Sequence, residues 1–225
     1  MAKATYKELQ IEDVGTVRVV RRKGQKNIRI SIKPDYILLS RPWYVSESQA
    51  LRFLRSKSGW VTANTEEPIV FSDGARIGRY HTLRIEPDRK RSHVTDSHIY
   101  TPDDPNLIKK SCLRALQAES ENLLKTRLDQ LSEQSGLPYH NLHIKHLRSR
   151  WGSCDSNHDI TLNSLLVQLP WDLIDYVILH ELTHTLEMNH SRSFWTKLER
   201  VCPRSSELKK TIKNYQTRIY PDMLK

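Results

Sequence analysis

The chain has 225 residues, enough for one or two domains with a hydrophobic core, so it needs neither disulfide bonds nor a structural metal in order to fold. Its 37% hydrophobic and 28% charged residues are typical of a globular protein, and no apolar run approaches the roughly 20 residues that span a bilayer. The net charge of +10 favours polyanionic partners, namely nucleic acid, nucleotides or acidic protein surfaces.

The N-terminal residues and the cysteines predict a cytoplasmic protein. The stretch MAKATYKELQIEDVG lacks the apolar segment of roughly 7–15 residues that marks a secretory signal. Cys112, Cys154 and Cys202 are odd in number and far apart, unlike a disulfide framework. We therefore expect a reduced compartment.

Period-two alternation from Thr16 to Tyr100 predicts a strand-rich N-terminal part, with strands at TVRVV, NIRISI, YILLS, HTLRI and SHIYT. One helix interrupts these strands. It begins at Ser46, whose hydroxyl can cap the amide of Gln49 while Gln49 reaches back. The apolar positions expected on its buried side are Ala50, Phe53, Leu54 and Trp60.

A basic cluster lies in the first predicted hairpin of this part. Such a cluster is either a solvated strand face or a surface that lies close to nucleic acid. Its members are Arg18, Arg21, Arg22, Lys23, Lys26 and Arg29.

A long helix follows the strands. Asp104 and Pro105 are typical of an N-cap and a first helical position, and Gly136 followed by Pro138 is typical of a helix end. The apolar spacing between them predicts about 30 helical residues, a length of roughly 45 Å. We therefore expect a strand-rich domain over residues 1–104 and a second domain over residues 105–225.

The second domain is expected to hold two strands and three helices. The strands are LHIKHLRSRWGSC and ITLN, joined by the turn DSNHD. The helices run from about Pro170 to Met188, from Ser191 to Val201, stopped by Pro203, and from Ser205 to about Tyr220. The predicted fold class is α+β.

The stretch HELTH carries the clearest chemical signal. His180 and His184 lie four residues apart, so on a helix both imidazoles project from one face and can reach one ion. Glu181 lies on the shoulder of that face, where it can reach a water molecule without binding the metal itself. Chance supplies only about 0.03 copies of this pattern in a chain of this composition. The apolar run before it, IDYVIL, fits a buried helix at the floor of a cleft.

A catalytic zinc has three protein ligands and an open position for water, so a third ligand is needed. His190 is favoured, because Asn189 can adopt a left-handed conformation that reverses the chain after Met188. A carboxylate from Glu199 or Glu207 is the alternative. The other ring nitrogen of such ligands often meets a carboxylate or a carbonyl. Asp175 and Glu187 are nearby candidates for that partner.

The stretch RSRWGSC contains candidate substrate-binding residues. Gly152 allows close backbone approach, so a strand here could pair with an extended peptide. Arg148 and Arg150 would share one strand face and could instead clamp phosphates. A purely structural hairpin, with Trp151 packed in the core, is the third interpretation.

The motifs RSRWGSC, ITLN, DYVILHELTH and NHSRSFW, in this order, resemble the YgjP-like (DUF45) family of predicted metal-dependent hydrolases, relatives of the SprT-like zincins. The N-terminal stretch RRKGQKNIRISIKP also resembles that family. The resemblance implies a minimal zincin-like core, with His180, His184 and His190 as ligands of zinc and Glu181 as catalytic base. It leaves the substrate open, because both peptidase and UTP pyrophosphatase activities are attached to the group.

We therefore expect a zinc-dependent metallopeptidase-like hydrolase in which activated water attacks a peptide bond, with Glu181 as general base. Another divalent transition metal could replace zinc. Two alternatives remain: a nucleoside triphosphate pyrophosphatase that uses the same site, and a non-enzymatic module that binds nucleic acid or protein around a structural zinc. The expected partner is a peptide or a nucleotide, and no membrane association is expected.

Overall fold

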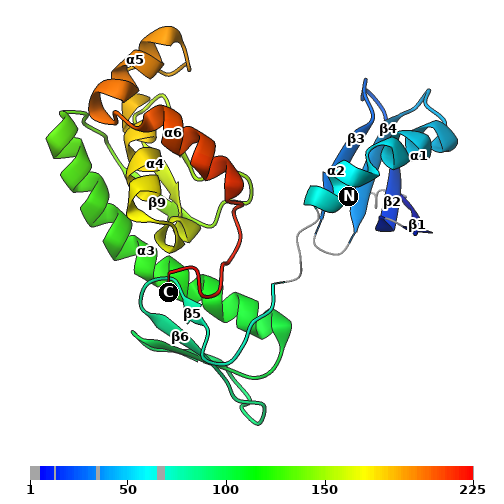
Figure 1. The fold of residues 1–225 in the computed structure, drawn as a ribbon, viewed down its shortest axis with the longest axis horizontal. Coiled ribbons are helices and arrows are strands. Elements are labelled where there is room, and N and C mark those ends of the chain that lie inside the picture. Colours follow the sequence, from blue (N-terminus) through cyan, green and yellow to red (C-terminus); the bar gives the residue numbers. More distant parts are fainter. Residues whose placement is uncertain (1–5, 13, 34–35, 65–68, 225) are drawn as a thin grey trace. The chain divides into compact units, whose positions relative to one another are not determined.

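The computed structural model describes residues 6–12, 14–33, 36–64 and 69–224, and it has the predicted mixed α+β fold (Figure 1). The chain divides into two compact units, residues 1–68 and 69–225. The sequence placed the division after residue 104 instead. The strands between residues 76 and 101 share a core with the long helix, which explains the difference.

The first unit is a four-stranded sheet, in the order β1-β2-β4-β3, packed against two short helices. Ser46 and Gln49 form the predicted capping box at the start of the first helix. Ala50 and Leu54 are buried as predicted, whereas Phe53 and Trp60 are exposed, and Trp60 lies beyond the end of that helix at Ser56. The elements are β1 (Tyr6–Ile11), β2 (Gly15–Arg22), β3 (Arg29–Ile32), β4 (Ile37–Pro42), α1 (Glu47–Ser56) and α2 (Ser58–Asn64).

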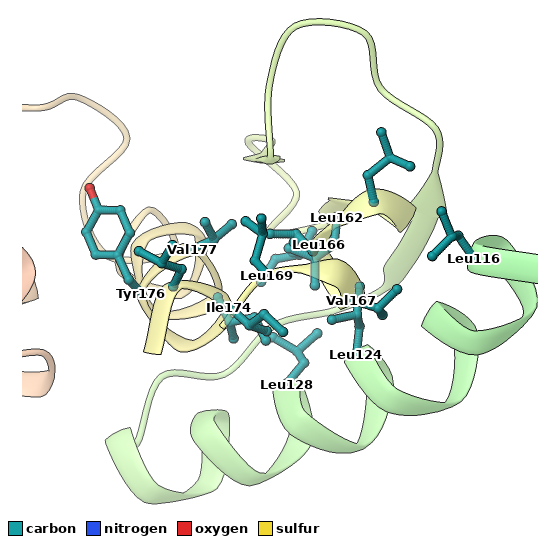
Figure 2. Close-up of a cluster of buried hydrophobic side chains, with 14 of the residues drawn as sticks. Leu116, Leu124, Leu128, Leu162, Leu166, Val167, Leu169, Ile174, Tyr176 and Val177 are labelled. Carbon is teal, nitrogen blue, oxygen red and sulfur yellow. The ribbon is translucent and has the colours of Figure 1, made fainter. Parts of the chain in front are cut away.

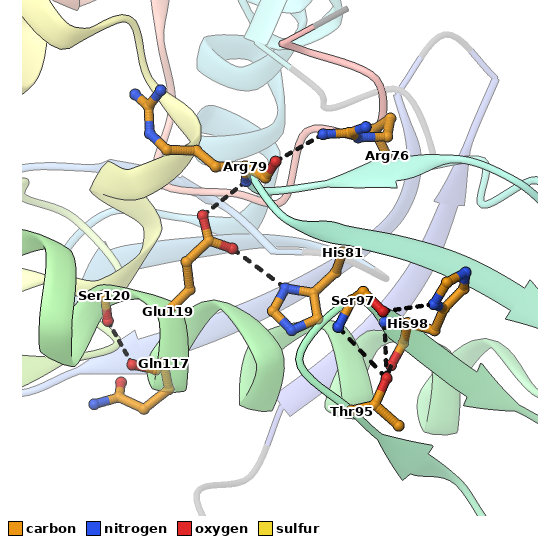
Figure 3. A network of polar contacts seen from close by, with 9 residues as sticks. All are labelled: Arg76, Arg79, His81, Thr95, Ser97, His98, Gln117, Glu119 and Ser120. Atoms are coloured by element: carbon orange, nitrogen blue, oxygen red, sulfur yellow. Dashed lines mark hydrogen bonds and ion pairs between the residues drawn. The ribbon is translucent and has the colours of Figure 1, made fainter.

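The second unit begins with a four-stranded sheet that packs on the long helix α3. Glu119 of α3 is buried beneath this sheet, accepts a 2.7 Å hydrogen bond from the backbone amide of Arg79, and lies 3.3 Å from Nδ1 of His81 (Figure 3). Arg79 also donates to the carbonyl of Leu169, just before helix α4. The strands are β5 (Arg76–Ile77), β6 (His81–Ile85), β7 (His93–Val94) and β8 (His98–Thr101).

Helix α3 (Pro105–Ser135) confirms the predicted long helix. The Asp104 carboxylate accepts hydrogen bonds from the backbone amides of Asn106 and Leu107 at the start of the helix. Gly136 ends the helix with a φ of 67°, in the left-handed region. Among the described residues, no helix combines the length and the apolar character that crossing a membrane requires.

A three-stranded sheet, in the order β10-β11-β9, and the C-terminal helices complete the second unit. The predicted strand LHIKHLRSRWGSC is two strands joined by a loop, because β9 pairs parallel with β11 while β10 pairs antiparallel with its other side. The elements are β9 (Leu142–Lys145), β10 (Gly152–Cys154), β11 (Ile160–Asn163), the 3-10 helix η1 (Ser164–Gln168), α4 (Trp171–Thr183), α5 (Arg192–Val201), α6 (Ser205–Thr211) and the 3-10 helix η2 (Ile212–Asn214).

The core of the second unit lies between α3, the η1 segment and α4 (Figure 2). Its side chains are aliphatic and almost all fully buried, so α4 is held along its inner side. Residues labelled in Figure 2 include Leu116, Leu124 and Leu128 of α3, Leu166 and Val167 of η1, and Ile174 and Val177 of α4.

A bidentate ion pair adds to this core. Arg127 of α3 donates from Nε and Nη2 to the two carboxylate oxygens of Asp175 on α4, both at 2.6 Å. We expect Asp175→Asn to lower the free energy of unfolding by about 1–2 kcal/mol, since the pair is charge-assisted and only partly exposed.

Urea denaturation checks this expectation. Glu207→Gln is the matched control, because Arg204 and Glu207 form a similar double contact that is more than half exposed. Its effect should stay below about 1 kcal/mol. Equal losses in the two variants would contradict the structural role given to the Arg127 pair.

Candidate metal centre

Helix α4 carries the HELTH motif at its C-terminal end. The helix is buried along most of its length, and His180 and Glu181 fall in its last turn. It ends at Thr183 rather than near Met188, with His184 as its C-cap. The chain then leaves the helix through a turn in which the amides of Leu186 and Glu187 both donate to the carbonyl of Thr183.

This early end of α4 brings His190 back toward the motif. The predicted left-handed Asn189 is not observed, since Asn189 has no positive φ. Instead the amide of Ser191 donates to the carbonyl of Asn189, and Ser191 caps helix α5. Phe194 of α5 packs edge-on against the His190 ring with centroids 4.7 Å apart, which fixes the segment between the two helices.

The three histidines converge on one point. Each offers one ring nitrogen, and these atoms lie within 4.8 Å of one another. The Nε2 atoms of His180 and His190 are 2.9 Å apart. The ring of His184 lies at 5.0 Å from that of His180 and at 4.6 Å from that of His190, centroid to centroid.

The outer nitrogen of His184 has a backbone partner. Its Nδ1 lies 3.0 Å from the carbonyl oxygen of Glu187, so Nδ1 donates there and Nε2 keeps its lone pair. The sequence named Asp175 and Glu187 as candidates for this role, and Glu187 fills it through its backbone carbonyl, while both carboxylates have other partners. The structure pairs these carboxylates with Arg127 and Lys197.

The pKa values of His180 and His190 favour neutral imidazoles. Burial, and then the charges that His184, His190 and Lys209 would carry, lowers the pKa of His180 to about 3. Burial also lowers the pKa of His190, aided by His184 and Lys209. Neutral rings with free lone pairs are the form in which histidine binds a metal.

Glu181 is buried beside this cluster and lies against strand β10. Burial raises the pKa of its carboxyl to about 8, against the opposing charge of Arg150. A Cβ atom added to Gly152 would lie 2.8 Å from both Cγ and Oε1 of Glu181. The absence of a side chain at Gly152 is therefore what admits the carboxylate.

Arg148 and Arg150 lie in the loop between β9 and β10, not on one strand face as predicted, and both side chains are exposed. The charge of Arg150 reaches Glu181, whereas that of Arg148, after burial, lowers the pKa of His146. The structure therefore brings Gly152 against Glu181, and of the two arginines it is Arg150 whose charge acts on the pKa of Glu181.

Asn163 holds this loop in place, a role that the sequence analysis missed. Its Nδ2 donates to the carbonyl oxygens of Leu147 and Arg150, at 2.7 and 2.9 Å, and its Oδ1 accepts from the amide of Leu165. The side chain is fully buried. A polar residue at the end of an apolar strand was the only signal for it.

Lys209 of α6 was also missed. Its ammonium lies 3.6 Å from the centre of the Trp195 ring, and that ring stacks on His190 with centroids 5.5 Å apart. The Trp195 ring therefore lies between the Lys209 ammonium and the His190 imidazole and packs against one face of that imidazole. These contacts join three separate segments, so spacing along the sequence could not reveal them.

The alternative carboxylate ligands lie elsewhere. Glu207 pairs with Arg204 at 2.8 Å on the surface, and Glu199 is exposed on α5. Among the described residues, the only cluster of three or more potential ligands is that of His180, His184 and His190.

Comparisons with known proteins identify the family of the chain. None of the curated proteins compared matches the chain significantly. The crystal structure of the metallopeptidase zymogen abylysin from Pyrococcus abyssi is 25% identical, with a TM-score of 0.37, and the match covers 40% of this chain and 92% of that one. The crystal structure of the metallopeptidase zymogen jannalysin from Methanocaldococcus jannaschii is 22% identical, with a TM-score of 0.36, and the match covers 40% of this chain and 94% of that one. A family model described as the YgjP-like metallopeptidase domain matches residues 26–215. The chain therefore belongs to the YgjP-like family of metallopeptidases.

Proposed function

We propose that this protein is a zinc-dependent peptidase in which His180, His184 and His190 hold the cation and Glu181 is the general base. The observation that carries the proposal is the convergence of three imidazoles beside the buried side chain of Glu181. Family membership supports a metal-dependent hydrolase of the peptidase kind.

The residues present fit a divalent transition metal. Nδ1 of His180 is buried without a hydrogen-bond partner among the described residues, and its Nε2 faces that of His190. Three imidazoles suit zinc and other late first-row metals. When bound, the cation supplies Lewis acidity that lowers the pKa of water to about 7 and polarises a carbonyl oxygen.

Glu181 moves the proton in this proposal. The charge of a bound cation would favour the ionised form of Glu181 against the effect of burial. In that form the carboxylate accepts a proton from the attacking water and delivers it to the leaving amine nitrogen as the peptide bond breaks. Gly152 keeps the space that this carboxylate occupies, and Nδ1 of His184 stays fixed by the carbonyl of Glu187.

The position of strand β10 favours an extended peptide as the substrate. It is the edge strand of its sheet, and it starts at Gly152, next to Glu181. An edge strand leaves backbone groups free for a further strand, so a peptide can add to the sheet with its scissile bond near the carboxylate.

Substrate profiling of the zinc-loaded protein tests this function. We expect cleavage within a peptide library, no hydrolysis in a panel of nucleoside triphosphates, and peptide cleavage that is about 10²–10⁴ slower with Glu181→Gln. Hydrolysis of triphosphates alone would favour the pyrophosphatase alternative. Inactivity in both sets with metal present would favour a structural zinc.

Arg150→Ala separates the first two outcomes, with Arg148→Ala as its matched control. Arg150 is the arginine whose charge reaches Glu181. For a peptidase we expect both variants to retain kcat/KM on peptides within about tenfold, or about 1.4 kcal/mol. A selective loss of triphosphate hydrolysis in Arg150→Ala would instead indicate that this residue binds phosphate.

A further inference from the structure

The sheet of the first unit has one covered face and one open face. Val17 and Val19 of β2 are in register with Ile37 and Leu39 of β4, and all four are buried in a core shared with α1 and α2. Because side chains alternate along a strand, the residues between them point to the opposite face. Arg18 and Arg22 of β2 belong to that open face, and Arg21 and Lys23, where the strand ends, line a hollow together with them.

A hollow of about 540 Å³ lies on this open face. Val20 and Leu38 line its floor. Four cations and two tyrosines surround them, so the hollow combines positive charge with aromatic rings. These residues are Arg18, Arg21, Arg22, Lys23, Tyr6 and Tyr36.

The guanidinium of Arg18 contacts the rings of both Tyr6 and Tyr36. Its guanidinium carbon lies 4.8 Å from the ring centre of Tyr6 and 4.0 Å from that of Tyr36, and its Nε donates to Glu8 at 2.7 Å. The charge of Arg18 is therefore engaged within the protein. The contacts hold both rings at the edge of the hollow, with Tyr6 half exposed.

The other three cations are available to a ligand. Arg21, Arg22 and Lys23 are exposed at the end of β2 and in the turn after it. Within residues 6–12, 14–33, 36–64 and 69–224, no carboxylate forms an ion pair with any of them. Three adjacent charges without an ion-pair partner, beside two aromatic rings, suit a ligand that is both anionic and flat.

We propose that this open face binds single-stranded nucleic acid. Phosphates would lie on Arg21, Arg22 and Lys23, and bases would stack at the tyrosines, the combination by which single strands are bound without sequence preference. An acidic peptide would satisfy the charges but would leave the rings unused. This inference goes beyond the proposed function and does not depend on it.

Fluorescence anisotropy with a labelled oligothymidylate of roughly 16 nucleotides tests the proposal on the full chain. We expect the triple variant Arg21→Ala, Arg22→Ala, Lys23→Ala to bind at least about tenfold more weakly, with the slope of log K against log salt reduced by about 2. Tyr6→Leu should weaken binding by about fivefold or more, because a stacking partner is lost.

A second triple variant, Arg52→Ala, Arg55→Ala, Lys57→Ala, is the matched control. It removes the same charge from exposed positions of α1 and the residue after it, and should bind as the wild type does. Equal losses in both triples, no binding by the wild type at low salt, or equally effective displacement by polyglutamate would each overturn the proposal. Glu181→Gln should bind the oligonucleotide normally, which separates this result from any result on catalysis.

Discussion

Glu181→Gln is expected to lower turnover by about 10²–10⁴, the contribution of a positioned general base. Glutamine keeps the size of the side chain in its buried place against Gly152, but it cannot accept the proton from water. Because Glu181 is not among the three converging ligands, the metal content should not change. Peptide cleavage measured alongside elemental analysis checks both parts.

The comparison variant for this result is Glu187→Gln. Glu187 lies in the turn after α4 and pairs with Lys197 on the surface, so its carboxylate is not directed at the site. We expect near wild-type turnover from it. Full activity of Glu181→Gln with metal bound would remove Glu181 from the mechanism and leave the rest of the site intact.

Gly152→Ala should be the second most damaging change. The added methyl carbon would lie 2.8 Å from Cγ and Oε1 of Glu181, closer than such contacts occur, so the carboxylate must move. A misplacement of about 1 Å can cost on the order of 10² in rate. We expect kcat to fall by that order while metal content stays at the wild-type level, because the histidines are not displaced.

Gly59→Ala is the matched control for this substitution. A Cβ atom at Gly59 meets nothing within 4 Å, so its effect on activity should be negligible. Unfolding experiments should accompany the kinetics, since overpacking costs about 1–3 kcal/mol. Unchanged kcat in Gly152→Ala would show that the glycine does not position Glu181.

Local signals in the sequence predicted most of the elements. The Ser46 capping box and the boundaries of α3 depend on residues within a few positions of each other, and the structure confirms them. Strand β1 and the two-residue strands β5 and β7 were missed. Their pairing depends on partners elsewhere in the sheet, and two residues carry no alternation pattern.

The sequence predicted which histidines come together, but it did not predict how the chain after α4 brings His190 to the other two. The four-residue spacing of HELTH placed His180 and His184 on one face, and the structure brings His190 to them. It does so through a tight turn after Thr183, not through a left-handed Asn189. The helix ends at Thr183, earlier than its own sequence indicates, and Phe194 of α5 packs against His190 beyond that end.

The loop with Arg148 and Arg150 shows the limit of pattern reasoning. The stretch LHIKHLRSRWGSC was predicted as one strand, but a loop separates β9 from β10, and Asn163 binds two carbonyls of that loop. The close approach of Gly152 to Glu181 is likewise a contact between distant segments. No spacing rule within either segment contains it.

Metal content tests the central claim most directly. The purified protein and its histidine variants would be analysed for bound metal after dialysis against a weak chelator. We predict a single divalent cation in the wild type, its loss in each of His180→Ala, His184→Ala and His190→Ala, and its retention in His143→Ala, which changes an exposed histidine on β9. A full complement of metal in His190→Ala, or none in the wild type after zinc is added, would contradict the three-histidine centre.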